Sequence, residues 1–554
     1  MQSMRDRVAQ LLVEYGGNVR KTARELEITP KAVRYHRDRL QADGELNIKP
    51  LAGGRVEDTA ARKEPLPLKG AVRRLILTCA QNNTLIHEGV WRSLKTLARH
   101  YRADIWVSTF AYNKNAYGQL AVKRGTAGHQ DELWYAPEIL PYVVDERVQL
   151  APGLVWCGEM NIQPTAANPL SSLDNYTRRK SGIFPHVKVA LQSVPSLANE
   201  SAKMNYTTGT VTLRNYIQKK AGQKAEFHHV YGALLVEIDD EGRWWCRQLI
   251  ADREGCIQDL DVRVAGDKLR TGCRVEAITW GDFHTAHLDP GVRRLGWGNY
   301  CEHRAGPNTP PGFLVEVSRP PEEGNMLDVL RPKEQHVHDL LDFYARNHHD
   351  RKDPHRMFRR HVEGKDRVED EVEEAARVLM EIDRPWCRTV VVDSNHDQAM
   401  SRWLRESDYR EDPLNAVFFL RAQLAQYEAL AARDDRFHLL EWALRRYGAP
   451  ERVRFLREDE SHVICGDIEC GMHGHLGPNG GKGSPQALAR MGRRANTGHT
   501  HSAAIFEGLY VAGTSSKLRL GYTAGPGSWS HSHVITYPNG KRAIVTMYSG
   551  KWRA

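Results

Sequence analysis

Five apolar stretches in the second half of the chain each end in a cluster of histidine, aspartate or asparagine residues. The clearest is TVVVDSNHDQ (389–398), in which three valines are followed by five polar residues. Short runs rich in β-branched residues and bounded by polar turns are typical of buried strands. Because strand ends in an α/β sheet converge on one crevice, the pattern predicts an α/β fold that gathers side chains from distant parts of the sequence.

The first 45 residues predict three short helices, the last of which begins where Thr29 precedes Pro30. A basic third helix joined to the second by a tight turn is the layout of a helix-turn-helix. The segment resembles Fis-like and homeodomain-like DNA-binding modules. That resemblance implies DNA contacts by three residues of the third helix: Lys31, Arg34 and Arg37. A basic helical hairpin that mediates oligomerisation is the alternative.

The rest of the chain is expected to form two further domains, because 554 residues exceed what one hydrophobic core accommodates. Residues 46–70 mix proline, glycine and charge without periodicity and predict a linker. Residues 71–270 predict an α/β domain of unassigned role, and residues 271–554 a second α/β block that closes in a hairpin around Asn539-Gly540. In the first of these blocks we expect a helix over 90–102 and strands over 73–79, 103–110, 187–193 and 232–239.

Composition indicates the cellular compartment of the protein and the kind of partner that it binds. The nine cysteines form no CxxC pair, which argues against a disulfide framework and a zinc knuckle. The sequence contains neither an apolar run long enough to span a membrane nor a secretory signal, so we expect a cytoplasmic protein without a membrane partner. The formal charge of +9 favours an anionic partner.

The five polar clusters contain the side chains listed here in chain order: Asp282 and His284, Asp339 and Asp342, Asn395 and His396, His473 and His475, His499 and His501. Each cluster alone is explained by a polar turn. Together they supply imidazole, carboxylate and amide oxygen, the ligands of divalent metals such as Mn²⁺, Fe²⁺ and Zn²⁺. The clusters contain no thiolate, which argues against a structural zinc site.

The order D-x-H, D-x-x-D, N-H-D, H and G-H-x-H across residues 282 to 501 resembles the calcineurin-like metallophosphoesterase superfamily, which includes phosphatases, cyclic-nucleotide phosphodiesterases and Mre11-type nucleases. The resemblance implies a four-layer fold, with two packed mixed sheets flanked by helices. It also implies two divalent ions, with Mn²⁺ as first choice and Fe²⁺, Zn²⁺ or Mg²⁺ as alternatives. The sequence departs from the motifs at His338 and Ser394, where the superfamily usually has glycine.

The resemblance also implies a role for each residue. One ion would be held by Asp282, His284 and His501, and the other by Asn395, His473 and His499. Asp339 would bridge the two ions. His396 would contact the scissile phosphate and protonate the leaving oxygen. For Asp397 two roles stay open: orienting the His396 ring, or capping the helix that follows.

Three features favour nucleic acid as the substrate: the predicted helix-turn-helix, the basic balance and the glycine-rich basic loop over 477–494. In that loop Lys482, Arg490, Arg493 and Arg494 would line a phosphate track, and a mobile surface loop is the alternative. With its AQNNT turn (80–84) and AEFHH segment (225–229), the chain resembles the pre-early host-DNA-degrading proteins of T5-like phages.

That resemblance implies a phage-encoded, Mn²⁺-dependent DNA nuclease acting in the bacterial cytoplasm, and it leaves a homo-oligomer open. Two other functions also stay open. One is a small-molecule or cyclic-nucleotide phosphodiesterase or phosphatase. The other is a DNA-binding regulator with a ligand-sensing, phosphoesterase-like domain.

Overall fold

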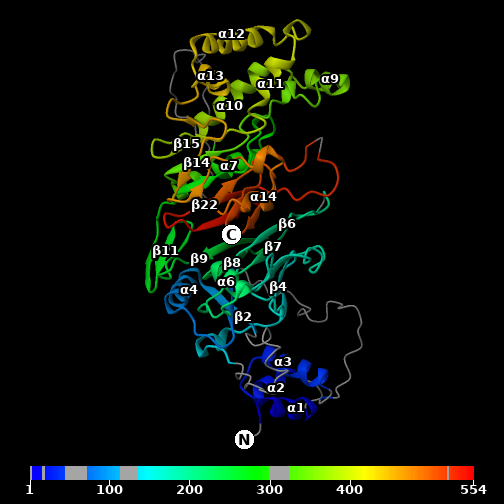
Figure 1. The fold of residues 1–554 in the computed structure, drawn as a ribbon, viewed down its shortest axis with the longest axis vertical. Helices are drawn as coiled ribbons and strands as arrows, with labels where there is room; N and C mark the ends of the chain where they lie inside the picture. Colours follow the sequence, from blue (N-terminus) through cyan, green and yellow to red (C-terminus); the bar gives the residue numbers. More distant parts are fainter. Residues whose placement is uncertain are drawn as a thin grey trace. The chain divides into compact units, whose positions relative to one another are not determined.

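The computed structural model describes residues 3–14, 19–43, 46, 72–112, 134–198, 200–298, 324–520 and 523–554 (Figure 1). Of the predicted linker 46–70, all but residue 46 lies outside these ranges. The chain divides into two compact units. Unit 1 comprises residues 1–194, 203–270 and 554, and unit 2 comprises residues 195–202 and 271–553.

Unit 1 begins with the helices α1 (Met4–Glu14), α2 (Val19–Glu25) and α3 (Pro30–Ala42). Val8 and Leu12 of α1 are buried against Val33 and Leu40 of α3, so the three helices share a small core. The Thr29 hydroxyl accepts a hydrogen bond from the Ala32 N–H at 3.1 Å. This is the capping contact that the Thr29-Pro30 pair predicts.

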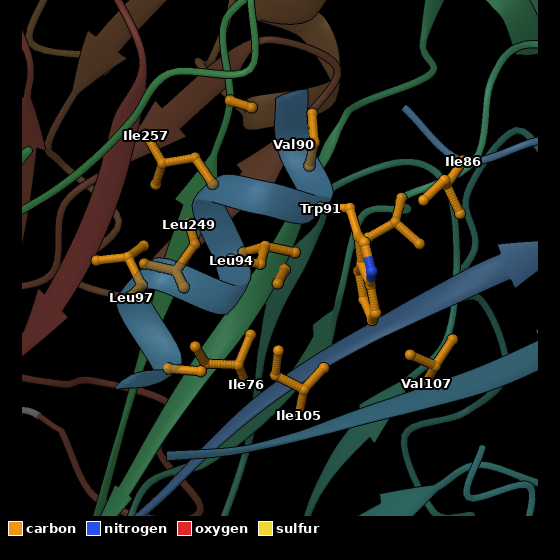
Figure 2. Close-up of a cluster of buried hydrophobic side chains, with 14 of the residues drawn as sticks. Ile76, Ile86, Val90, Trp91, Leu94, Leu97, Ile105, Val107, Leu249 and Ile257 are labelled. Atoms are coloured by element: carbon orange, nitrogen blue, oxygen red, sulfur yellow. The ribbon is translucent and has the colours of Figure 1, made fainter. Parts of the chain in front are cut away.

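The first sheet of unit 1 contains four strands in the order β2-β1-β8-β9. Their bounds are β1 (Arg73–Gln81), β2 (Ala103–Phe110), β8 (Gly232–Ile238) and β9 (Trp244–Ile250). Helix α4 (Glu88–Tyr101) connects β1 to β2 and covers the sheet. Figure 2 shows Leu94 and Leu97 of α4 above Ile76 and Ile105, in one buried cluster. Burial of such side chains contributes roughly 1.5 to 3 kcal/mol each.

A second set of strands in unit 1 pairs in the order β6-β7-β5-β4-β3. The strands are β3 (Arg147–Ala151), β4 (Leu154–Cys157), β5 (Ser181–Phe184), β6 (Leu191–Val194) and β7 (Lys203–Thr207). The strand predicted over 187–193 therefore begins later, at Leu191, because residues 186–188 form a turn in which the His186 ring accepts the Lys188 N–H. Unit 1 also contains η2 (Pro137–Tyr142), α6 (Lys220–Phe227) and the small sheet β10 (Ile257–Asp259), β11 (Val262–Ala265) and β12 (Lys268–Arg270).

The first sheet of unit 2 has the order β16-β15-β14-β13-β22-β23. Its strands are β13 (Ala277–Thr279), β14 (Glu334–Val337), β15 (Arg388–Val391), β16 (Arg454–Phe455), β22 (Ser532–Thr536) and β23 (Arg542–Thr546). Strands β13 to β16 are parallel, so their carboxyl ends lie along one edge of the sheet. β22 and β23 form the hairpin predicted around Asn539-Gly540.

A second set of strands in unit 2 pairs in the order β17-β18-β19-β21-β20. The strands are β17 (Val463–Ile464), β18 (Ile468–Glu469), β19 (Arg494–Thr497), β20 (Ala504–Phe506) and β21 (Leu509–Val511). β18, β19 and β21 are parallel to one another. Unit 2 therefore has two sets of mixed strands, each with several parallel strand ends.

The helices of unit 2 are α7 (Pro290–Gly296), α8 (Met326–Leu330), α9 (Pro354–Val362), α10 (Val368–Ile382), α11 (Ala399–Glu406), α12 (Ala416–Ala432), α13 (Leu439–Arg446) and α14 (Pro485–Ala489). Short 3-10 turns are η3 (Thr285–His287), η4 (Tyr344–Arg346), η5 (Tyr409–Glu411) and η6 (Pro478–Gly480). Helices α10 to α13 pack on one another in the segment between β14 and β16. The mixed α/β class predicted from the sequence is confirmed. Among the helices of the described ranges, none combines the length and apolar character that crossing a bilayer requires.

Candidate metal centre

The strand ends of unit 2 bring the predicted ligands together. Asp282 and His284 follow β13, Asp339 follows the neighbouring strand β14, and Asn395 follows β15. The remaining three histidines come from the other strand set. His473 follows β18, and His499 and His501 follow β19.

One group contains four buried side chains whose ligand atoms all lie within 4.8 Å of one another: Asp282, His284, Asp339 and His501. The Nε2 atoms of His284 and His501 are 3.0 Å apart, and His501 Nε2 is 3.0 Å from Asp282 Oδ2. Asp339 Oδ2 lies 3.5 Å from His284 Nε2. Two carboxylates and two imidazoles pointing at one another can hold a metal ion.

Asp339 also borders a second group. Its Oδ2 atom lies 3.2 Å from His473 Nε2, and His473 Nδ1 is 3.9 Å from Asp282 Oδ1. The His499 ring packs edge-on against His473, with ring centroids 5.2 Å apart. Asp339 therefore lies between imidazoles of both groups, His284 on one side and His473 on the other.

Several buried polar atoms of these residues have no hydrogen-bond partner among the residues that the structure describes: Asp282 Oδ1, Asp339 Oδ1, Asn395 Oδ1 and His473 Nε2. Leaving such an atom unpaired costs about 1 to 3 kcal/mol, and more when the group is charged. All four are potential metal-ligand atoms, so the donor set fits divalent cations. Asn395 adds a neutral oxygen to this set.

The electrostatics of the cluster favour positive charge at this position. Burial opposes the ionisation of Asp282 and Asp339, but His473 and the other nearby imidazoles outweigh it and lower the pKa of both carboxyls. Burial also opposes protonation of His284, yet the hydrogen bond to Asp342 and the charge of Asp339 raise the pKa of this imidazole to about 9. The nearby carboxylates also raise the pKa of His473, whereas burial lowers the pKa of His501 and lowers that of His499 to about 4.

The backbone at these residues adopts a conformation that most side chains avoid. The φ angles of His284, Asp339, His499 and His501 are 45°, 44°, 74° and 57°, all in the left-handed region. Such residues cost of order 1 kcal/mol or more each and concentrate at functional sites. Gly498 is required for packing, since a Cβ there would lie 2.1 Å from Asp282 Oδ1. The His499 N–H donates to the other oxygen of Asp282 at 2.7 Å.

Asp342 is the functional candidate that received no role from the sequence. Its Oδ1 is 2.9 Å from His284 Nδ1 and 3.5 Å from His396 Nδ1, and its carbonyl oxygen is 3.1 Å from the same His396 atom. Asp342 thus holds the rings of two site residues, in the way that carboxylates orient ligating histidines. The D-x-x-D spacing with Asp339 was the available signal.

Asp397 lies differently from both expectations for it. One carboxylate oxygen accepts the Leu341 N–H at 2.9 Å, and the other accepts the Ser394 hydroxyl at 2.8 Å. Helix α11 starts after Gln398 without a side-chain cap. Asp397 therefore ties the loop after β15 to the loop after β14, and burial raises its pKa to about 7. His396, whose side chain is 25% exposed, faces Asp342 instead.

Comparison with known proteins gives one decisive relative. The chain is 37% identical to protein A1 of Escherichia phage T5 over 516 residues, which cover 91% of this chain and 86% of that protein. The chain belongs to the family of phage protein A1. No family model matches it, and neither does any solved structure.

In this member of the protein A1 family, the two departures from glycine fit the site. The Ser394 hydroxyl bonds to Asp397, as described above. The buried His338 ring lies with its Nδ1 3.4 Å from His473 Nδ1, and burial lowers its pKa to about 3. His338 also forms a potential metal-binding group with Asp282 and His473. It is an additional imidazole at this site that the motif alone did not reveal.

The basic residues singled out in this protein A1 relative differ in exposure. In α3, Lys31 is buried with its Nζ 3.4 Å from the Met160 carbonyl, and Arg37 pairs with Asp38 at 2.7 Å. Arg34 is partly exposed. In the 477–494 loop, Lys482 and Arg493 are exposed, whereas Arg494 is bound to Asp467 and to the Gly540 carbonyl.

Proposed function

We propose that the chain is a dimetal-dependent phosphodiester hydrolase that degrades DNA. The observation that carries the proposal is the buried set around Asp339, in which unpaired carboxylate and imidazole atoms lie close together, with the unpaired Asn395 amide oxygen after the neighbouring strand β15. Membership of a phage protein family supports a phage-encoded enzyme, and we place its action in the bacterial host cytoplasm.

We further propose that unit 2 has the four-layer metallophosphoesterase fold and that residues 271–554 form the catalytic domain. Its two strand sets and the order of its motifs support this assignment. The helices α1 to α3 would be the helix-turn-helix of residues 1–45, and residues 71–270 the intervening α/β domain.

Two divalent ions, with Mn²⁺ ahead of Fe²⁺, Zn²⁺ and Mg²⁺, would when bound polarise the phosphoryl oxygens and lower the pKa of a water molecule. The residues that would hold one ion are Asp282, His284 and His501. Those that would hold the other are Asn395, His473 and His499. Asp339 would serve both, because its Oδ2 atom already lies within 3.5 Å of His284 and 3.2 Å of His473.

The chain itself would supply proton transfer. The carbonyl oxygen and carboxylate of Asp342 face His396 Nδ1, so that this nitrogen donates to them and Nε2 is left to transfer a proton. His396 would protonate the leaving oxygen of the phosphodiester. Asp397 would act indirectly, by fixing the two loops that carry Asp339 and His396.

DNA is the proposed substrate because the protein is basic and exposed basic side chains lie near the site residues along the chain. The protein carries a net charge of +9, and Lys482, Arg490 and Arg493 are exposed in the loop before His499. Such side chains bind phosphate without reading sequence. Arg34 and Arg37 of α3 would add contacts outside the catalytic domain.

Incubation of the purified protein with linear and circular DNA and Mn²⁺ tests this function. We expect both the loss of DNA and its prevention by EDTA. The matched control is Asp393→Asn, which changes a nearby carboxyl whose Oδ2 accepts a hydrogen bond from the Gln398 amide at 2.6 Å. This variant should cleave DNA as the unsubstituted protein does. Intact DNA together with cleavage of bis-p-nitrophenyl phosphate or a cyclic nucleotide would instead identify a small-molecule phosphodiesterase.

A further inference from the structure

Unit 1 repeats the strand connections of unit 2. In the first sheet, β1 pairs with β2 in parallel and with β8 antiparallel, and β8 pairs with β9 antiparallel. In unit 2, β13 pairs with β14 in parallel and with β22 antiparallel, and β22 pairs with β23 antiparallel. The four strands also occur in the same order along the chain.

The second strand sets match as well. In unit 1 the pairs β6–β7, β7–β5, β5–β4 and β4–β3 are antiparallel, parallel, parallel and antiparallel. In unit 2 the pairs β20–β21, β21–β19, β19–β18 and β18–β17 have the same four directions. Nine strands of each unit therefore follow one topology.

Side-chain hydrogen bonds within each unit show which residues of the two units correspond. In unit 1 the Thr210 hydroxyl donates to the Cys79 carbonyl at 2.8 Å and lies 2.9 Å from the Thr212 hydroxyl. In unit 2 the Thr514 hydroxyl donates to the Asp282 carbonyl at 2.9 Å and lies 2.7 Å from the Ser516 hydroxyl. Cys79 thus occupies the position of Asp282.

The start of the next helix follows the same correspondence, with one more residue between Cys79 and its cap in unit 1 than between Asp282 and its cap in unit 2. His87 donates its N–H to the Val211 carbonyl at 2.7 Å and caps α4. Asp289 donates its N–H to the Ser515 carbonyl at 2.9 Å and caps α7. Because Gln81 stands two residues after Cys79, as His284 stands two after Asp282, Gln81 occupies the position of His284.

The β5 and β19 pairings place the remaining positions. Phe184 pairs with Thr207, three residues before Thr210, and Thr497 pairs with Val511, three residues before Thr514. His186 and Lys188 then occupy the positions of His499 and His501. By the β4 and β18 registers, Glu159 occupies the position of His473. In β2, Ser108 pairs with Cys79, and continuing the β13–β14 register by three residues sets Asp339 opposite Asp282, so Ser108 stands where unit 2 has Asp339.

We propose that residues 73–270 are a second copy of the unit 2 fold whose described residues have lost the metal centre that unit 2 builds around Asp339. The inference rests on the proposed metal-dependent function of unit 2. It assigns unit 1 a non-catalytic role. Lys188 then stands at the position equivalent to the proposed ligand His501.

The contacts in unit 1 leave these side chains unsuited to a divalent ion. The Cys79 thiol donates to the Gly209 carbonyl at 3.2 Å, and burial raises its pKa to about 12, so it stays protonated. His186 Nδ1 accepts the Lys188 N–H at 3.0 Å, and its Nε2 lies 3.1 Å from the Gln163 carbonyl. Lys188 itself is a cation, with Nζ 2.6 Å from the Ala166 carbonyl.

The acidic side chain at these positions is also weakened as a ligand. One oxygen of Glu159 accepts the Tyr176 hydroxyl at 2.9 Å, the other has no hydrogen-bond partner among the described residues, and burial raises the pKa of the carboxyl. Gln81 offers only an amide oxygen, since its amide nitrogen donates to the Asn215 carbonyl at 2.8 Å. One carboxyl with a raised pKa and one neutral amide supply little of the negative charge that two dications require.

Mn²⁺ binding by the full-length protein, measured by equilibrium dialysis with elemental analysis, tests the proposal. Two matched double variants are compared: Asp282→Ala with His284→Ala in unit 2, and Cys79→Ala with Gln81→Ala in unit 1. We expect at least a tenfold loss of Mn²⁺ affinity in the unit 2 variant, and unchanged content and DNA cleavage in the unit 1 variant. If the unit 1 double variant does not fold, Gln81→Ala alone serves.

The failures of the two proposals differ. Retention of Mn²⁺ by the unit 2 variant, or its loss from the unit 1 variant, in a protein that cleaves DNA overturns the loss of the centre from unit 1 and leaves the function standing. An unsubstituted protein that binds no Mn²⁺ overturns the proposed function and this inference together.

Discussion

The ends of β1 and β13 have the same hydrogen-bonded frame but carry different chemistry. A threonine hydroxyl clamps the carbonyl of the first position in both, Thr210 on Cys79 and Thr514 on Asp282. At that position and two residues later, unit 2 presents a carboxylate and an imidazole, and unit 1 a thiol and an amide. The comparison teaches that this turn sets geometry, whereas a few side chains decide whether a site exists.

Two buried charged clusters, one in each unit, are also arranged differently. In unit 1 the buried Arg247 pairs with Asp259 at 2.9 Å and with Glu237, so that each of these buried charges has an opposite charge beside it. In unit 2 the buried carboxylates of Asp282 and Asp339 each keep an oxygen without a hydrogen-bond partner among the described residues. The first arrangement serves stability, and the second is suited to bind a cation.

Asp339→Ala should have the largest effect on this contrast, because one carboxylate faces both groups of imidazoles. We expect no detectable Mn²⁺-dependent DNA cleavage, measured by the release of acid-soluble nucleotides. Cys79→Ala in unit 1 is the control and should cleave as the unsubstituted protein does. If Asp339→Ala still cleaves DNA, the proposal that unit 2 contains the active site is wrong.

His396→Ala should separate chemistry from metal binding. We expect kcat to fall by about 10² to 10⁴, the usual contribution of a positioned acid, while bound Mn²⁺ is unchanged. Single-turnover cleavage and metal analysis on the same preparation measure the two quantities. A loss of metal from this variant would contradict the role given to His396.

Asp342→Asn should have a smaller effect, since Asp342 is a positioning residue for the His284 and His396 rings. We expect Mn²⁺ affinity or kcat to fall by about 10- to 100-fold, as for other residues that orient metal ligands. Mn²⁺ titration of the cleavage rate detects this, and a purely structural role would leave the Mn²⁺ dependence unmoved. Asp393→Asn is again the matched control.

The remaining effect is one of pH on stability rather than on activity, with opposite signs in the two units. Burial, helped by the charge of Asp342, raises the pKa of Glu371 to about 7, although its carboxylate accepts the Tyr344 N–H at 2.9 Å. Its contribution to stability is therefore complete below about pH 4.5 and lost as pH rises through 7, a change of about 3 kcal/mol. Glu371→Gln should abolish this loss, seen as a higher melting temperature at pH 8.

Glu237 of unit 1 should behave in the opposite way. Burial raises its pKa, but Arg247 and Arg74 outweigh burial and lower it. Its contribution is thus present above the unfolded pKa and is lost as pH falls through the folded one. Glu237→Gln should lower the melting temperature at pH 8, and an unchanged value there would contradict this account of the buried pair.

Much of the candidate site was predictable from the sequence because each proposed ligand follows an apolar run. Strand ends at Asp282, Asp339 and Asn395 could be identified from local pattern alone. The contact of Asp342 with two histidine rings could not, because spacing along the chain does not say which way a loop carboxylate turns. For the same reason the two roles left open for Asp397, orienting His396 or capping the next helix, both missed its contact with the Leu341 N–H.

The fold was less predictable than its elements. The Asn539-Gly540 hairpin and the start of α3 rest on local turn and cap chemistry, which the sequence states directly. The repetition of one topology in both units has no such local signal. Equivalent residues such as Gln81 and His284 differ in chemistry, and the match lies in strand pairings between residues far apart in the chain.

Anomalous diffraction at the manganese edge, from crystals of the full-length protein grown with Mn²⁺, tests the central claim most directly. The account predicts strong peaks within bonding distance of Asp339, flanked by His284 and His473, and none at Cys79 or Gln81. Peaks absent from Asp339, or present beside Cys79 and Gln81, would contradict it.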